Sequence, residues 1–267
     1  SDPLGDPQLL TALADLSLRM GPEDVEGWLL RCAEAQSAWF GPGSWQEPLR
    51  PHVERLLGLS PGLDDAALAA MCADDAFDVE PLRHCLEVNR AVKGIKGHAA
   101  ADAIGHWLGS AAVARLGAID ALSNVFLTKA GTLRSTTAQE KIDANYLHLA
   151  EAVCDAIAAV AQLRTLKALA DRLVPALRLG RAFALAWDEA KKREGLIDFD
   201  DQIRLAAGLL NTSSLSAWIR YKLDRRFDHV LVDEAQDTNA AQWQIIDALT
   251  DDFFAGEGQH GQGVMRT

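Results

Sequence analysis

The chain has 267 residues, of which 49% are apolar and 24% charged, a mix typical of a folded protein of one or two domains. The alanine-rich run 144–170 is interrupted by charged side chains, so we expect no membrane span and no membrane partner. The first residues lack a basic stretch followed by an apolar one, so we expect no signal peptide and a cytoplasmic location. Four cysteines without a CxxC pair favour reduced, mostly buried thiols over a metal site.

The charge is unevenly distributed along the chain, whose formal net charge is −12. Residues 1–80 carry 15 acidic and 4 basic side chains, residues 81–197 carry 11 and 16, and residues 198–267 carry 12 and 6. The net charge argues against non-specific nucleic-acid binding by the whole chain, but the central segment is basic and suits phosphates. DNA binding does not explain the acidic region 1–80, for which a partner subunit or another domain is one interpretation.

Short helices separated by glycine and proline are predicted from residue 7 to about residue 122. The first of them begins at Asp6-Pro7, because an aspartate before a proline is typical of a helix start. Residues 125–128 and 132–134 are β-prone and flank a turn containing Gly131, which predicts a small hairpin.

Apolar residues recur every three or four positions from residue 138 to 194, which predicts one or two long amphipathic helices. Pro175 is expected to break or kink this stretch, and Gly195 follows its basic last turn as a helix end. Asp198 and Asp201 then form an acidic variant of the capping box, so another helix is predicted from there to about residue 210.

The one strong strand signal is Val230–Val232, followed by a polar turn and a helix from about residue 240 to 249. Strand, acidic turn and helix in this order indicate an α/β arrangement, but a lone strand must take its sheet neighbours from residues outside this chain. The sequence therefore predicts a mostly α protein: a helical bundle with a small hairpin, followed by a partial α/β segment with few strands.

Asp233 and Glu234 stand where ligands collect in open α/β sheets, at the carboxyl end of the predicted strand. An aspartate there can hold Mg²⁺ through water, and an adjacent glutamate can orient and deprotonate an attacking water. The alternative is that both residues only cap the following helix. Gln236 has a donor and an acceptor and can sense a phosphate or a water, and Asp237 is equally well explained as the cap of that helix.

Residues 230–239, VLVDEAQDTN, resemble the DEXQD motif of the UvrD/Rep superfamily 1 helicases. Residues 195–201, GLIDFDD, are similar to the DFxDL stretch of the same family, with Gln202 in place of the usual leucine. Residues 251–258 are similar to the extended loop of AddA-type subunits of bacterial double-strand-break repair helicase–nucleases. The chain is therefore identified as a member of this helicase family, most like an AddA subunit.

The resemblance implies that residues 1–197 are a helical 1B-like subdomain and residues 198–267 the C-terminal part of the first RecA-like domain. It implies that Asp233 is the Mg²⁺ ligand and contacts the bound nucleotide, that Glu234 is the catalytic base, and that Gln236 links nucleotide state to DNA contacts.

A phosphate-cradling GxxxxGK[ST] loop is absent, and no Gly-Lys dipeptide occurs in the chain. We therefore expect an inactive fragment without bound ligand, cut from a parent that uses Mg²⁺ and ATP to translocate on and unwind DNA in recombination repair. The parent is expected to assemble with an AddB-like second subunit.

The basic segment offers candidate DNA contacts, which suit the task expected of a 1B subdomain. Lys93 and Lys96 belong to a cluster of cations around the turn at residues 94–97, and Lys129 and Arg134 flank the tip of the predicted hairpin. The alternative for each is an ordinary solvated charge. For the whole chain, the alternative is a stand-alone helical protein–protein interaction module without nucleotide chemistry.

Overall fold

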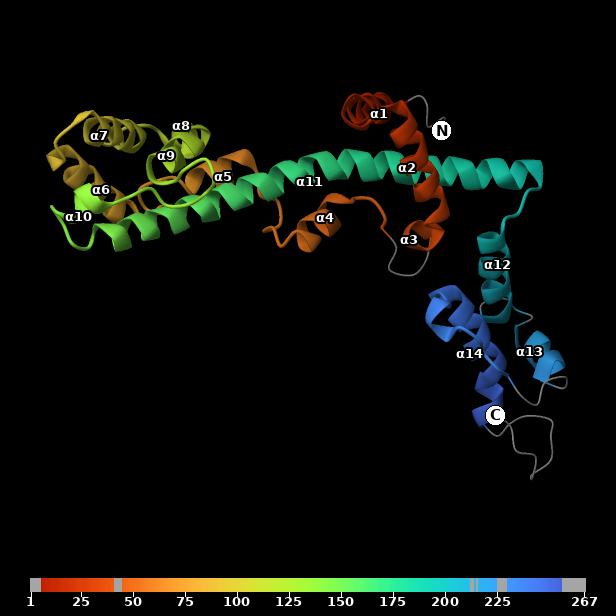
Figure 1. The fold of residues 1–267 in the computed structure, drawn as a ribbon. Coiled ribbons are helices and arrows are strands. Elements are labelled where there is room, and N and C mark those ends of the chain that lie inside the picture. Colours follow the sequence, from red (N-terminus) through yellow and green to blue (C-terminus); the bar gives the residue numbers. More distant parts are fainter. Residues whose placement is uncertain (1–5, 41–44, 212–213, 215, 225–229, 256–267) are drawn as a thin grey trace. The chain divides into compact units, whose positions relative to one another are not determined.

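The computed structural model describes residues 6–40, 45–211, 214, 216–224 and 230–255, which divide into two compact units (Figure 1). The first unit consists of residues 1–29 and 35–182, and the second of residues 30–34 and 183–267. Among the described residues, the helices that begin before residue 183 are α1 (Pro7–Met20), α2 (Pro22–Glu34), α3 (Gln36–Phe40), α4 (Arg50–Leu56), α5 (Asp65–Ala70), α6 (Val79–Ala91), α7 (Ile95–Leu108), α8 (Ala112–Gly117), α9 (Ile119–Phe126), α10 (Thr137–Glu140) and α11 (Tyr146–Glu194).

The start of α1 confirms the prediction made from Asp6-Pro7. The Asp6 side chain accepts a hydrogen bond of 2.9 Å from the Gln8 backbone N–H, and Pro7 occupies the first helical position. Proline costs little there because its missing N–H has no partner within the helix anyway.

The main core of the first unit lies where α6, α7 and α9 pack against the N-terminal half of α11, and Figure 1 shows these helices gathered along that half. Its fully buried side chains include Leu82, Ile104, Ile119 and Val153. Burial of one such aliphatic side chain contributes about 1.5–3 kcal/mol. A smaller cluster of Val53, Leu59 and Ala170 packs α4 and the loop after it onto the middle of α11.

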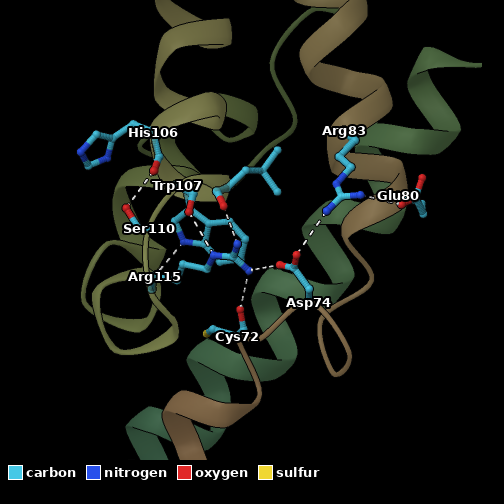
Figure 2. Close-up of polar contacts among 9 residues, drawn as sticks. Cys72, Asp74, Glu80, Arg83, His106, Trp107, Ser110 and Arg115 are labelled. Carbon is cyan, nitrogen blue, oxygen red and sulfur yellow. Dashed lines mark hydrogen bonds and ion pairs between the residues drawn. The ribbon is translucent and has the colours of Figure 1, made fainter.

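Arg115 of α8 is a buried cation that joins three segments of this core (Figure 2). Its guanidinium donates to the carbonyls of Trp107 (3.1 Å), Cys72 (3.0 Å) and Leu108, and to the Asp74 carboxylate (2.5 Å). The same group lies over the Trp107 ring at 4.9 Å from its centroid. The bond from Arg115 lowers the pKa of Asp74, so this ion pair is present at neutral pH.

The predicted hairpin is only partly present, because α9 extends to Phe126 and takes up the first two residues of the expected strand. A single antiparallel bridge joins Leu127 and Leu133, and Thr128 N–H donates to Thr132 C=O at 2.8 Å. Gly131 has φ +76°, as the turn requires. The helix prevails because Phe126 is buried in the core, which a two-residue ladder does not offset.

The stretch forms one long helix, α11, which continues through Pro175, so a break at this proline is wrong and a kink there stays a prediction. Buried Ala170, Ala176 and Leu179 pack on both sides of the proline and hold the helix together there. The predicted helix end is confirmed: α11 stops at Glu194, Gly195 has φ +67°, and Leu196 N–H donates to Lys191 C=O at 2.9 Å.

Helix α11 is also long and apolar enough to cross a membrane by length and composition alone, with a mean hydropathy of 1.3 over 18 residues. This is weak evidence, since core helices of water-soluble proteins pass the same test. One face of α11 carries Val153, Ile157 and Val160 into the main core. The absence of a membrane partner stays a prediction.

The second unit contains the end of α11, α12 (Phe199–Asn211), α13 (Ser216–Asp224), a 3₁₀ turn η2 (Ala235–Asp237) and α14 (Ala240–Ala255). The predicted strand Val230–Val232 does not form within this chain: these residues have no regular secondary structure, and Leu231 is 96% exposed. A strand needs hydrogen-bonding neighbours, and the part of the chain that the structure describes supplies none to this segment. The prediction of a mostly α chain is confirmed.

Candidate functional site

The candidate nucleotide site is the turn that precedes α14. Asp233 and Glu234 form a bend, and residues 235–237 form the 3₁₀ turn η2. Glu234 has φ +49° and ψ +45°, the left-handed conformation that a non-glycine residue adopts at a cost of about 1 kcal/mol. It is stabilised by Asp237 N–H, which donates to Glu234 C=O at 2.8 Å.

The acidic side chains of this turn bond to groups of the turn itself. The Asp233 carboxylate accepts from Glu234 N–H at 3.0 Å, and the Gln236 amide donates to the Glu234 carboxylate. All three residues are exposed. The structure thus brings Asp233, Glu234 and Gln236 into one turn, as predicted, but at the surface and not at the end of a strand.

The start of α14 decides between the two interpretations of Asp237. Asn239 N–H donates to the Gln242 side chain at 2.8 Å, and Gln242 N–H donates to the Asn239 side chain at 2.9 Å. This reciprocal pair is a capping box, so Asn239 is the cap and the interpretation of Asp237 as the cap is wrong. Neither Asp233 nor Glu234 makes a capping bond to α14 in this structure.

The donor chemistry of the turn fits Mg²⁺, which prefers carboxylate oxygens and keeps several waters. The Asp233 and Glu234 carboxylates are adjacent and accessible to solvent. In the described residues, no group of three or more His, Cys, Asp and Glu side chains is placed to hold a metal ion. The turn alone therefore offers two ligands of suitable type, not a complete metal site.

The junction between α11 and α12 is a dense ionic network inside the second unit. Asp201 N–H donates to the Asp198 side chain at 2.8 Å and Asp198 N–H to the Asp201 side chain at 3.3 Å, which confirms the predicted capping box. Lys191 Nζ lies 2.6 Å from a carboxylate oxygen of each aspartate. Arg204 contacts Asp201 at 3.0 Å and Asp188 at 3.4 Å.

Three members of this network are buried, namely Asp188, Lys191 and Asp201. Burial disfavours the charged ammonium of Lys191, but the hydrogen bonds to Asp198 and Asp201 outweigh it, so the pKa of Lys191 is raised. Lys191 therefore stays charged at neutral pH. From the sequence, Lys191 was interpreted only as a cation at a helix end. No repeating pattern indicates that it contacts Asp198 and Asp201, which follow Gly195.

The candidate DNA contacts lie in two exposed segments of the first unit. Lys93 and Lys96 are exposed on either side of Gly94, which has φ +122° at the tight turn between α6 and α7. A side chain at Gly97 would meet Val92 at 2.7 Å, so the turn is closely packed. Lys129 and Arg134 are exposed around the Leu127–Leu133 bridge, and Arg134 donates to Asn124 C=O at 3.1 Å.

Within the described part of the chain, no carboxylate lies within ion-pair distance of Lys93, Lys96, Lys129 or Arg134, a property that they share with other cations such as Arg19 and Arg55. Lys141, the first residue after α10, is a further exposed cation that the sequence analysis did not name. The Gln139 amide donates to Asn89 of α6 at 3.0 Å, which brings α10 to the end of α6 nearest the turn. That proximity is tertiary and leaves no sequence signal.

Comparison with known proteins gives the class to which the site belongs. The model of the UvrD/REP helicase N-terminal domain matches residues 112–255, more than half of the chain. The chain belongs to this helicase family.

Individual proteins also match parts of the chain. The chain is 40% identical over 68 residues to an ATP-dependent helicase/nuclease subunit of Exiguobacterium sibiricum, an alignment that covers 26% of this chain and 6% of the relative. A protein of the same name from Listeria monocytogenes is 34% identical over 82 residues, 31% of this chain and 6% of the relative. The ATP-dependent DNA helicase UvrD1 of Mycobacterium tuberculosis is 40% identical over 75 residues, 27% of this chain and 9% of the relative. The matched part thus spans less than a tenth of each relative, and no solved structure matches the chain.

Proposed function

We propose that this chain is a segment of an ATP-dependent DNA helicase, most like an AddA subunit, that acts in recombination repair of double-strand breaks. The observation that carries the proposal is the turn of Asp233, Glu234 and Gln236 within the family match of residues 112–255. Residues 1–197 act in it as a 1B-like subdomain and residues 198–267 as the end of the first RecA-like domain.

Each acidic residue has a separate task in this proposal. Asp233 would hold the Mg²⁺ of a bound Mg-ATP, and the chemistry that Mg²⁺ would supply there is neutralisation of phosphate charge. Glu234 orients the attacking water and takes its proton. Gln236 donates to the Glu234 carboxylate and so holds it in place, which gives the glutamine a way to affect hydrolysis.

The apolar surface of the second unit supports the proposal that further parts of the parent cover it. Leu196, Ile197, Phe199 and Leu231 are between 59% and 96% exposed. Covering side chains this large would remove apolar surface from water, which is favourable. We propose that further strands of a RecA-like sheet pair with residues 230–232 and order the turn that follows them.

DNA is the proposed partner of the basic segment. Exposed cations without carboxylate partners bind phosphates at little cost, since no ion pair has to be broken. Lys93, Lys96, Lys129 and Arg134 satisfy this description in the described part of the chain. The parent is proposed to be cytoplasmic and to assemble with an AddB-like second subunit.

An ATPase assay with and without single-stranded DNA tests the proposal. We expect no turnover by the 267-residue chain, because it lacks a GxxxxGK[ST] loop. In the protein extended along its reading frame on both sides, Glu234→Gln is expected to lower kcat by roughly 10²-fold or more, because it removes the general base. Asp247→Asn, an exposed change in α14, is the matched control and is expected to keep full activity.

Two outcomes contradict the proposal. Turnover by the 267-residue chain that Glu234→Gln abolishes would mean that a complete site lies within it. An extended frame without a GKT or GKS loop would favour the stand-alone interaction module.

A further inference from the structure

The ionic network at the α11–α12 junction contains an inner and an outer lysine. Lys191 has a side chain only 10% exposed and contacts both aspartates of the capping box at 2.6 Å. Lys192 has a side chain 66% exposed and contacts Asp188 alone, at 2.6 Å. Adjacent lysines of one helix thus play different parts, and the inner one connects the last turn of α11 to the first turn of α12.

The capping box depends on the inner lysine for electrostatic reasons. The Asp198 and Asp201 carboxylates both lie against one ammonium, so they are close to each other. Asp201 is buried, and one of its carboxylate oxygens serves both Lys191 and the Asp198 N–H. Without the ammonium, the buried Asp201 carboxylate would keep Arg204 at 3.0 Å but lose its closer cationic partner, and it would face the half-exposed Asp198 carboxylate without the charge between them, which is costly. The direction in which α12 leaves the junction therefore depends on Lys191.

Helix α12 in turn holds the helix that follows the acidic turn. α12 and α14 pack against each other, with Ala207, Leu210 and Ala248 buried. The Asn211 side chain donates to Gln244 C=O at 3.3 Å, which adds a polar contact between the two helices. Because α14 begins three residues after Asp237, a shift of α12 moves the anchor of the acidic turn.

We propose that Lys191 is a positioning residue that fixes α12 at the end of α11 and, through α12, the first turns of α14 beside Asp233 and Glu234. Its relevance to ATP hydrolysis rests on the proposed function, whereas the connection between the helices does not. The ammonium acts by holding two carboxylates, so a residue of similar length without charge does not replace it. Lys192, on the exposed side, does not share this role.

Hydrogen–deuterium exchange of the 267-residue chain, read by mass spectrometry, tests the proposal without nucleotide. Lys191→Met keeps the length of the side chain and removes its charge. We expect it to speed amide exchange roughly tenfold or more in residues 199–204 and also in residues 240–247. Lys191→Arg keeps the charge and is expected to restore most of the protection. Lys192→Met is the matched control and is expected to leave both segments unchanged.

Asp198→Asn keeps an acceptor for the Asp201 N–H but weakens the contact with Lys191, so it tests the same connection if Lys191→Met does not fold. We expect severalfold faster exchange in both segments. Unchanged exchange in residues 240–247 in the folded variants overturns the proposal, as does an equal effect of Lys192→Met. These readings are independent of ATP turnover, so a failed ATPase assay and a failed connection are distinguishable.

Discussion

The core around Arg115 and the turn around Glu234 satisfy their polar groups in opposite ways. Arg115 is buried and donates to four acceptors supplied by two other segments, residues 72–74 and 107–108, as Figure 2 shows. Asp233 and Glu234 are exposed and bond only to neighbours within a few residues. The first region is complete within this chain, whereas the second is held locally. Stability of the chain therefore depends on the first region, and the proposed chemistry on the second.

The largest expected effect on stability is that of Arg115→Met. The change leaves the carbonyls of Cys72, Trp107 and Leu108 without their donor and removes the charge that pairs with Asp74. We expect the free energy of unfolding to fall by about 3 kcal/mol or more, measured by urea denaturation. Arg83→Met is the control, because Arg83 is half exposed and contacts Asp74 and Glu80 at 3.2 Å. A fall of similar size in both variants would refute the distinction between the two arginines.

A smaller effect, on DNA binding and not on folding, is expected for the double variant Lys93→Ala and Lys96→Ala. If both lysines contact phosphates, their loss makes the slope of log K against the logarithm of the salt concentration less steep by about 2. Titration of forked DNA at several salt concentrations measures this slope. The double variant Arg19→Ala and Arg55→Ala removes the same charge from exposed sites in the acidic region and serves as control. Equal slopes for the two double variants would contradict the proposal that the α6–α7 turn contacts DNA.

The smallest effect on stability is expected for Leu231→Ser. The side chain is 96% exposed, so its removal changes little apolar burial in this chain. We expect the free energy of unfolding to stay within about 0.5 kcal/mol of the unchanged protein. Leu82→Ala, at a fully buried leucine, is the counterpart and is expected to cost about 2–5 kcal/mol. A large loss for Leu231→Ser would show that residues 230–232 are packed after all.

Local signals in the sequence predicted local structure well. The cap at Asp6, the helix end at Gly195 and the capping box of Asp198 and Asp201 are confirmed, because each depends on residues within a few positions. The capping box of Asn239 and Gln242 is equally local, and it replaces the interpretation of Asp237 as the cap of α14.

Features that depend on distant residues were predicted poorly. The strand at residues 230–232 needs neighbours, and the first half of the hairpin yielded to the burial of Phe126. Arg115 donates to the Cys72 carbonyl and Lys191 to the Asp201 carboxylate, and no repeating sequence pattern predicts either contact. For the candidate site, the sequence was sufficient to place Asp233, Glu234 and Gln236 in one turn, but not to describe the surroundings of that turn.

Pro175 gives α11 one turn that is weaker than the rest. Proline has no N–H, so the carbonyl of Asp171, four residues earlier, lacks its donor within the helix. The Asp171 side chain is held by Arg50 at 2.7 Å and Lys167 at 2.8 Å, which ties this turn to α4 and to the preceding turn of α11. We therefore expect α11 to bend first at residues 171–175. The contacts of Arg50 and Lys167 with Asp171 limit the size of this bend.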